Sequence, residues 1–189
     1  MPHDSNSAPE ALRQYTNDMS ALDKHIVEPL QHQKDDDRFK TDPRVASFLA
    51  DALQTFEHHV NELQPHVDRF GAGAGKVVKE AVAGALGVAA GVYDKIRKDP
   101  VSRALRDDYV AFNQAAISYT MLHTTALAFS DEPLAELAKK QLNEITPLIM
   151  RLTEIIPHVV VQELQDEDGS IRHEAADLAS KAGQEAWSK

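Results

Sequence analysis

Residues 41–70 read TDPRVASFLADALQTFEHHVNELQPHVDRF and carry the strongest structural signal in this chain. The stretch opens with a helix-start signal, because Asp42 can cap the first turn and Pro43 suits the first helical position. Apolar side chains then recur every three or four residues, which is the period of one face of an α-helix. They are Val45, Phe48, Leu49, Ala52, Phe56, Val60, Leu63, Val67 and Phe70. The stretch therefore predicts a long amphipathic helix that buries one face.

The same period appears in three further segments, at residues 12–30, 101–126 and 134–164. The charged run at 34–38 separates the first from the second, Asp99 and Pro100 open the third, and residues 130–133 lead into the fourth. No segment alternates with the period of two that a half-buried strand requires. We therefore expect an all-α protein whose four long helices form an antiparallel four-helix bundle.

A glycine-rich segment lies between the second and third of these helices. After the break GAGAG at residues 71–75, apolar side chains at helical spacing extend over 77–96 and predict an extra helix. Gly84, Gly87 and Gly91 lie on one face of it, and each costs about 1 kcal/mol relative to alanine in a helix. Such a face favours close approach of another backbone. Packing on the parent bundle is the favoured interpretation, and a homo-oligomer formed through this face is the main alternative.

Composition narrows the partners and the domain organisation. Residues 1–8 are expected to be a disordered lead, 9–165 the bundle, and 166–189 a polar hinge with a tail helix. The 189-residue chain has a formal charge of −10, which disfavours binding to nucleic acid, and no cysteine. Its longest uncharged apolar run, residues 81–93, is too short for a membrane span of about 20 residues, so no transmembrane segment is predicted. A cytoplasmic location is the default expectation, since the first ten residues lack a signal-peptide pattern.

Two stretches resemble a known group of proteins. In residues 56–70, an aromatic residue is followed by His, Glu, a second His and a basic residue, and this pattern resembles the second helix of the YciF-like stress proteins. Residues 119–142, with a Ser-Asp turn at Ser130 and an apolar run after Pro133, are similar to the junction of that group's third and fourth helices. The resemblance implies a bundle of the ferritin-like superfamily, in a group associated with stress responses and often with a di-metal carboxylate centre.

Matched position by position, the resemblance implies four metal ligands. They are Glu62 and His66 on the second helix, with Glu28 on the first and Glu144 on the fourth as looser matches. Iron or manganese is the cofactor that such a centre would hold. The third helix departs from the pattern, because Phe112 and Ala115 stand where relatives place carboxylates. The resemblance thus implies the architecture together with an incomplete centre.

Helical geometry refines the ligand set. At 100° per residue, His59 and His66 lie near the apolar centre of the second helix, and Glu62 and Glu144 lie at the boundary of their faces. Glu28 falls opposite the apolar stripe of the first helix, unless Pro29 changes the phase. A repeated spacing places three potential ligands on one face of each of two consecutive helices. The two triplets are His25, Glu28, His32 and His59, Glu62, His66. They indicate either a metal site or a coincidence of solvated side chains.

His123 is the remaining polar residue predicted on an apolar face, near the centre of the third helix, and the favoured interpretation is a core histidine with a hydrogen-bond partner.

No catalytic residue is predicted from these patterns. The preferred hypothesis is a non-catalytic ferritin-like bundle protein with a binding, structural or stress-associated role. The first alternative is a ferritin-like protein that binds metal and oxidises or stores iron or manganese. The second is a hemerythrin-like binder of iron or oxygen, suggested by His58 and Glu62 at a spacing of four residues.

Overall fold

The computed structural model describes residues 9–70, 100–167 and 169–187, and these residues are helical apart from short turns. The helices are α1 (Glu10–Asp35), α2 (Pro43–Arg69), α4 (Val101–Ala128), α5 (Glu132–Glu167) and α6 (Ala175–Trp187), with a 3-10 turn η1 (Asp37–Lys40) after α1. Within the described ranges there is no strand, so the all-α expectation is confirmed. The predicted glycine-rich helix and its Gly84, Gly87 and Gly91 face lie outside these ranges.

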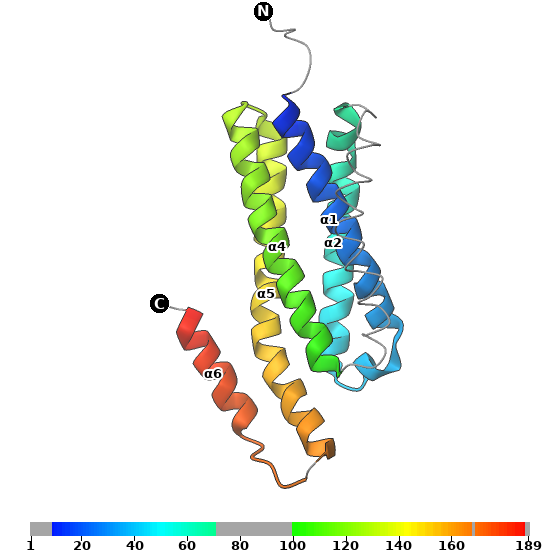
Figure 1. Ribbon diagram of the computed structural model, residues 1–189, viewed down its shortest axis with the longest axis vertical. Helices are drawn as coiled ribbons and strands as arrows, with labels where there is room; N and C mark the ends of the chain where they lie inside the picture. The colour runs from blue at the N-terminus through cyan, green and yellow to red at the C-terminus, as the bar shows by residue number, and fades with distance from the viewer. Residues whose placement is uncertain (1–8, 71–99, 168, 188–189) are drawn as a thin grey trace, which may run out of the picture.

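The long helices pack side by side as a bundle (Figure 1). α1 contacts α2 and α4, and α5 contacts the same two helices from the opposite side. Neighbouring helices run in opposite directions, so α1 and α5 descend in the view of Figure 1 while α2 and α4 ascend. Consequently α2 ends at one end of the bundle and α4 begins at the other.

Helix boundaries follow the local signals in the sequence. Asp42 caps α2 by accepting a hydrogen bond from the backbone N–H of Arg44 (2.8 Å), and Pro43 is the first helical residue. The α4–α5 connection is a tight turn in which Ser130 adopts a φ of 57°, and the N–H of Asp131 bonds to the carbonyl of Ala126 (2.9 Å). α5 extends to Glu167, slightly beyond the predicted end of the bundle at residue 165.

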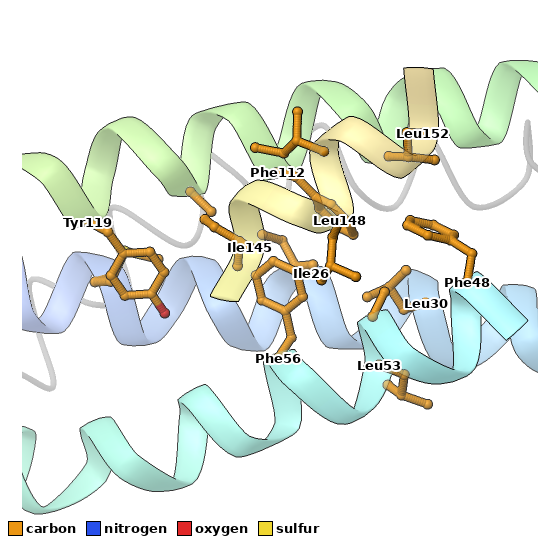
Figure 2. Packing of buried hydrophobic residues seen from close by; sticks show 14 of the residues in the cluster. Ile26, Leu30, Phe48, Leu53, Phe56, Phe112, Tyr119, Ile145, Leu148 and Leu152 are labelled. Atoms are coloured by element: carbon orange, nitrogen blue, oxygen red, sulfur yellow. The ribbon is translucent and has the colours of Figure 1, made fainter. Parts of the chain in front are cut away.

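The core lies between α1, α2, α4 and α5. Phe56 and Phe48 from α2 meet Phe112 from α4, with ring centroids 4.8 and 6.1 Å apart. Leu30 of α1 and Ile145 of α5 also point into the core (Figure 2). Burial of such large apolar side chains contributes about 1.5–3 kcal/mol each. Phe112 is therefore a central core residue.

The tail helix α6 lies against the outer side of α5. Ala176 is the only buried residue of α6 among those described. Its side chains also hydrogen-bond to α5, as in the bond from Gln184 to Glu154 (3.0 Å). α6 is therefore attached far less firmly than the helices of the bundle.

None of the described helices is both long and apolar enough to cross a membrane.

Candidate functional site

A chain of polar side chains crosses the apolar core and involves all four helices of the bundle. It begins at Asp23 on α1, which is fully buried, and passes to Tyr119 on α4, His59 on α2 and Glu144 on α5. Tyr119 Oη lies 2.6 Å from Asp23 Oδ2 and 3.1 Å from His59 Nδ1, and His59 Nε2 lies 2.9 Å from Glu144 Oε2. We call these four residues the polar chain.

The outer end of the polar chain is closed by Lys140. Its Nζ lies 2.7 Å from Glu62 Oε2 and 3.1 Å from Glu144 Oε1, so that one ammonium group bridges two carboxylates. Glu62 also contacts His58 Nε2 at 3.1 Å. Both glutamates are partly exposed, whereas His59 is fully buried. The polar chain therefore runs from the sealed interior to a charged cluster at the surface of α2 and α5.

Burial sets the protonation of the inner residues. Desolvation raises the pKa of Asp23 to about 8, although the hydrogen bond with Tyr119 and the charge of Lys24 lower it. Desolvation also lowers the pKa of His59, against the opposing effect of Glu144, and raises the pKa of Tyr119 well above its usual value. At neutral pH we therefore expect Asp23 to be protonated, His59 neutral and Tyr119 a phenol.

At the outer end of the polar chain, charged partners shift the pKa values more than desolvation does. Desolvation raises the pKa of Glu144, but hydrogen bonds from Lys140 and His59 outweigh it, and the net pKa is lowered. The pKa of Glu62 is lowered in the same way, chiefly by Lys140. For Lys140 desolvation is likewise outweighed by its two carboxylate partners, which raise its pKa. The outer cluster is therefore ionised at neutral pH, with the lysine between two carboxylates.

These protonation states are consistent with one direction of hydrogen bonding. The Asp23 carboxyl donates to Tyr119 Oη, the Tyr119 hydroxyl donates to His59 Nδ1, and His59 Nε2–H donates to ionised Glu144. If Asp23 is ionised instead, the Tyr119 hydroxyl donates to it, and His59 must be a doubly protonated imidazolium to donate both to Tyr119 Oη and to Glu144. The lowered pKa of His59 therefore favours the first arrangement.

A second buried polar pair lies elsewhere in the α1–α4 interface. Gln33 Nε2 donates to Asp108 Oδ1 (2.9 Å), and desolvation raises the pKa of Asp108 to about 7, with a hydrogen bond from Gln33 opposing the shift and nearby Asp107 adding to it. Asp108 Oδ2 and Gln33 Oε1 are buried without a partner in the described structure. Asp23 Oδ1 and Gln141 Oε1 share this property. Protonation of the two buried carboxyl groups lowers the cost of leaving their oxygens without partners.

The structure places the predicted ligands in different environments. Glu28 is exposed on α1, as its phase predicted, so Pro29 does not turn it inward. His32 is also exposed and His25 is half-buried, while Glu62 is held by Lys140 on the far side of α2. The two predicted triplets are therefore not brought together around one point.

Some of the predicted ligands on α2 and α5 do come into contact. His59 and Glu144 are in direct contact, and Glu62 is joined to Glu144 through Lys140. His66 is half-buried, with Nδ1 lacking a hydrogen-bond partner in the described part of the chain, and desolvation lowers its pKa. In the ranges 9–70, 100–167 and 169–187 no three His, Asp or Glu side chains are grouped so as to hold a metal ion.

The donor set does not fit a dinuclear metal centre. Nε2 of His59 is engaged with Glu144, and both outer glutamates are engaged with an ammonium group. At the two positions matched by the resemblance α4 has Phe112 and Ala115, and its buried carboxyl, Asp108, is paired with Gln33 instead. A di-metal bundle site requires carboxylates or histidines directed inward from each helix. The inward polar groups found here are hydrogen-bonded to one another.

Three comparisons were made for this chain, with models of protein families, with curated proteins and with solved structures. None of them finds a match.

Sequence reasoning did not identify Asp23, Asp108, Lys140 or Gln141 as members of these clusters. Three of them carried a usable signal, because each lies in line with apolar neighbours at helical spacing. Asp23 follows Met19 by four residues, Asp108 precedes Phe112 by four, and Gln141 precedes Ile145 by four. A polar residue in an apolar stripe is buried when the helix packs. Lys140 carried no such signal, because its role depends on two carboxylates from different helices.

His123 matches its prediction as a satisfied core histidine. It is half-buried, and its Nδ1 lies 2.8 Å from the backbone carbonyl oxygen of Ala135 on α5. The hydrogen bond ties α4 to α5 and leaves His123 outside the polar chain.

Proposed function

We propose that this protein is a non-catalytic ferritin-like bundle protein with a binding, structural or stress-associated role. The observation that carries the proposal is the position of Lys140, whose ammonium group lies within 3.1 Å of both Glu62 and Glu144. These are two of the carboxylates that the resemblance assigns to metal. The ammonium group lies between them and offsets part of their negative charge, so the chain itself supplies a cation at this position.

The bundle geometry supports the same proposal. Neighbouring helices are antiparallel, and α2 ends at one end of the bundle while α4 starts at the other. This arrangement is compatible with the single long crossover of ferritin-like folds. The interior of the bundle holds a closed hydrogen-bonded chain in place of an open ligand set. Such a protein acts through its surfaces rather than through interior redox chemistry.

The test measures metal content and the dependence of stability on metal. We expect protein purified from medium supplemented with iron and manganese to contain far less than one metal ion per chain. We also expect its melting temperature to be unchanged by a chelator, because no metal contributes to the folded state. Stoichiometric metal that disappears in Glu62→Ala would overturn the proposal and favour the metal-binding alternative.

A pair of lysine variants tests the specific role of Lys140. Lys140→Met removes the ammonium group and leaves Glu62 and Glu144 as adjacent carboxylates, so we expect this variant to gain affinity for Mn²⁺. Lys139→Met is the matched control, because Lys139 is an exposed neighbour that pairs with Glu136 instead. Equal Mn²⁺ binding by the wild type and both variants, measured by calorimetry, would contradict this role.

The metal-binding alternative rests on one feature of the same cluster. His59 Nε2, Glu144 and Glu62 are the three predicted ligands that come together, at the α2–α5 interface around Lys140. Displacement of the lysine would leave an imidazole and two carboxylates there, a donor set that suits iron or manganese. The metal measurement above separates this alternative from the preferred function.

The hemerythrin-like alternative depends on His58 and Glu62. These side chains contact each other at 3.1 Å on the outer edge of α2, and His58 is exposed. A visible absorption band after aerobic loading with iron would favour this alternative, and its absence would remove it.

A further inference from the structure

The outward face of α4 differs from the outward faces of the other bundle helices. Residues 109–130 contain no Asp, Glu, Lys or Arg, although the chain as a whole carries a formal charge of −10. Large apolar side chains are exposed there, with Val110 60% exposed, Ile117 58% and Met121 43%. Exposed apolar side chains that lie together commonly mark an interaction surface.

These side chains form a single stripe along the helix. At 100° per residue, six exposed positions fall within about 40° of one line. They are Val110, Gln114, Ile117, Met121, Thr124 and Ala128. We call them the α4 outer stripe. It extends from Val110 to Ala128, which corresponds to about 27 Å of helix.

The other outward faces of the bundle are charged. Exposed charges include Asp18 and Glu28 on α1, Asp51 and Glu57 on α2, and Glu136 and Lys139 on α5. Docking through any of them would desolvate charged groups, and the acidic excess would repel a second acidic molecule. Docking through the α4 outer stripe desolvates no charged side chain.

The stripe is also complementary to itself. In an antiparallel pair centred on the middle of the stripe, Ile117 lies opposite Met121 of the partner subunit, and Gln114 lies opposite Thr124 of the partner subunit. Val110 then faces Ala128 of the partner subunit. Apolar pairs occupy the centre and the ends, while side chains that can hydrogen-bond face each other between them. A two-fold interface requires this kind of self-complementarity.

Charges at the two ends of the stripe agree with the antiparallel arrangement. Exposed Arg103 and Arg106 lie before the stripe at the start of α4, together with Asp107, which pairs with Arg106. Exposed Glu132 and Glu136 follow the stripe at the start of α5, where Glu136 pairs with Lys139. An antiparallel pair places the arginine end of one copy beside the glutamate end of the other. A parallel pair would instead place like charges together.

We propose that the α4 outer stripe is a docking surface for a second copy of this chain, forming an antiparallel two-fold dimer. A contact made by one helix from each copy is smaller than a standard stable interface of about 1,200–2,000 Å². The dimer therefore dissociates on dilution. The proposal is independent of the proposed function, because a bundle with or without metal has the same outward face.

Charge-swap variants test the arrangement by sedimentation velocity over a range of concentrations. We expect the wild type to shift from monomer to dimer as its concentration rises. Ile117→Lys and Met121→Glu each place two like-charged residues in the contact, and each alone remains monomeric. A mixture of the two recovers a dimer, because Lys at 117 of one copy faces Glu at 121 of the other. A wild type that is monomeric at every concentration overturns the proposal.

The controls separate loss of the contact from loss of the fold. Gln54→Lys adds a charge on the exposed face of α2, and it should dimerise like the wild type. Circular dichroism and melting temperature should be unchanged in all three variants, since the substituted side chains are exposed. Dimerisation by Ile117→Lys alone, or failure of the mixture to recover the dimer, also overturns the proposal.

Cysteine cross-linking provides a second measurement, because the chain contains no cysteine. Mixing Ile117→Cys with Met121→Cys should give more disulfide-linked dimer under mild oxidation than either variant alone. Preferential linking of Ile117→Cys to itself would indicate a parallel pair and contradict the antiparallel arrangement.

Discussion

At the scale of single residues, the interior is unusual in holding polar groups whose protonation is set by burial. Tyr119 joins two such groups, since its hydroxyl lies between the Asp23 carboxyl and the His59 imidazole. Asp108 is a separate case with one polar partner, Gln33. In both places the cost of burying a carboxyl group is reduced when the carboxyl is protonated.

Replacing Tyr119 with phenylalanine should show how much the hydroxyl contributes. Tyr119→Phe keeps the ring and removes the group that bridges Asp23 and His59, leaving both with an unmet hydrogen bond. We expect the free energy of unfolding to fall by about 1–3 kcal/mol. Denaturant titration measures the change. Tyr109→Phe is the matched control on a half-buried tyrosine of the same helix, and an equal loss there would contradict the bridging role.

Asp108 should make stability depend on pH. Its pKa of about 7 in the folded state exceeds the ordinary value of 3.8, so between these pH values the folded state holds a proton that the unfolded state has lost. The free energy of unfolding therefore falls as pH rises from about 4 to about 7. Asp108→Asn should remove this part of the slope and raise stability at pH 8 by about 1–3 kcal/mol.

The measurement for Asp108 is a series of denaturant titrations from pH 5 to pH 8. Part of the slope should persist in Asp108→Asn because Asp23, with a pKa of about 8, acts in the same direction. Asp68→Asn is the control, since Asp68 is exposed on α2, away from Asp108. An unchanged slope in Asp108→Asn would show that the group is ionised in the folded protein.

At the scale of elements, local signals account well for where helices begin and end. The Asp42 cap and Pro43 start α2 as predicted, and residues 130–133 separate α4 from α5. Prolines inside α1, α2 and α5 do not end these helices, because tertiary packing outweighs their local cost. At Ser130 the residue type and the backbone conformation disagree, because serine does not favour a positive φ.

The turn at Ser130 offers a stabilising substitution. Ser130→Gly should raise the free energy of unfolding by about 0.5–1 kcal/mol, because glycine adopts a φ of 57° without steric cost. Ser130→Ala is the matched control and should give no gain, since alanine has the same Cβ. Thermal unfolding distinguishes the two variants. A gain in the alanine variant equal to that in the glycine variant would argue against relief of backbone strain.

At the scale of the whole molecule, the bundle and the tail helix differ in how firmly they are held. α4 and α5 share a broad apolar interface, whereas α6 buries Ala176 alone among its described residues. Free energies of local opening follow buried apolar contact, so the molecule should open in separate units. The tail opens first.

Hydrogen exchange should reveal this difference directly. Backbone amides of α6 should exchange at least tenfold faster than those at the centres of α2 and α4, and deletion of residues 170–189 should change the melting temperature only slightly. The physical reason is that polar contacts at the surface, such as Gln184 with Glu154, contribute little. Equal protection of α6 and α4 would show that the tail is part of the cooperative core.

Apolar periodicity was sufficient to predict the helical class, the approximate limits of the helices and most of the core residues. The reason is that the spacing of apolar side chains shows which face of a helix is buried. Helical phase also placed Glu28 toward solvent and His59 inside. It did not show that Lys140 would lie between Glu62 and Glu144, or that Asp23, Tyr119 and His59 would meet. Those contacts join residues from different helices, and they depend on the relative rotation and axial position of packed helices, which a spacing pattern along one chain segment does not contain.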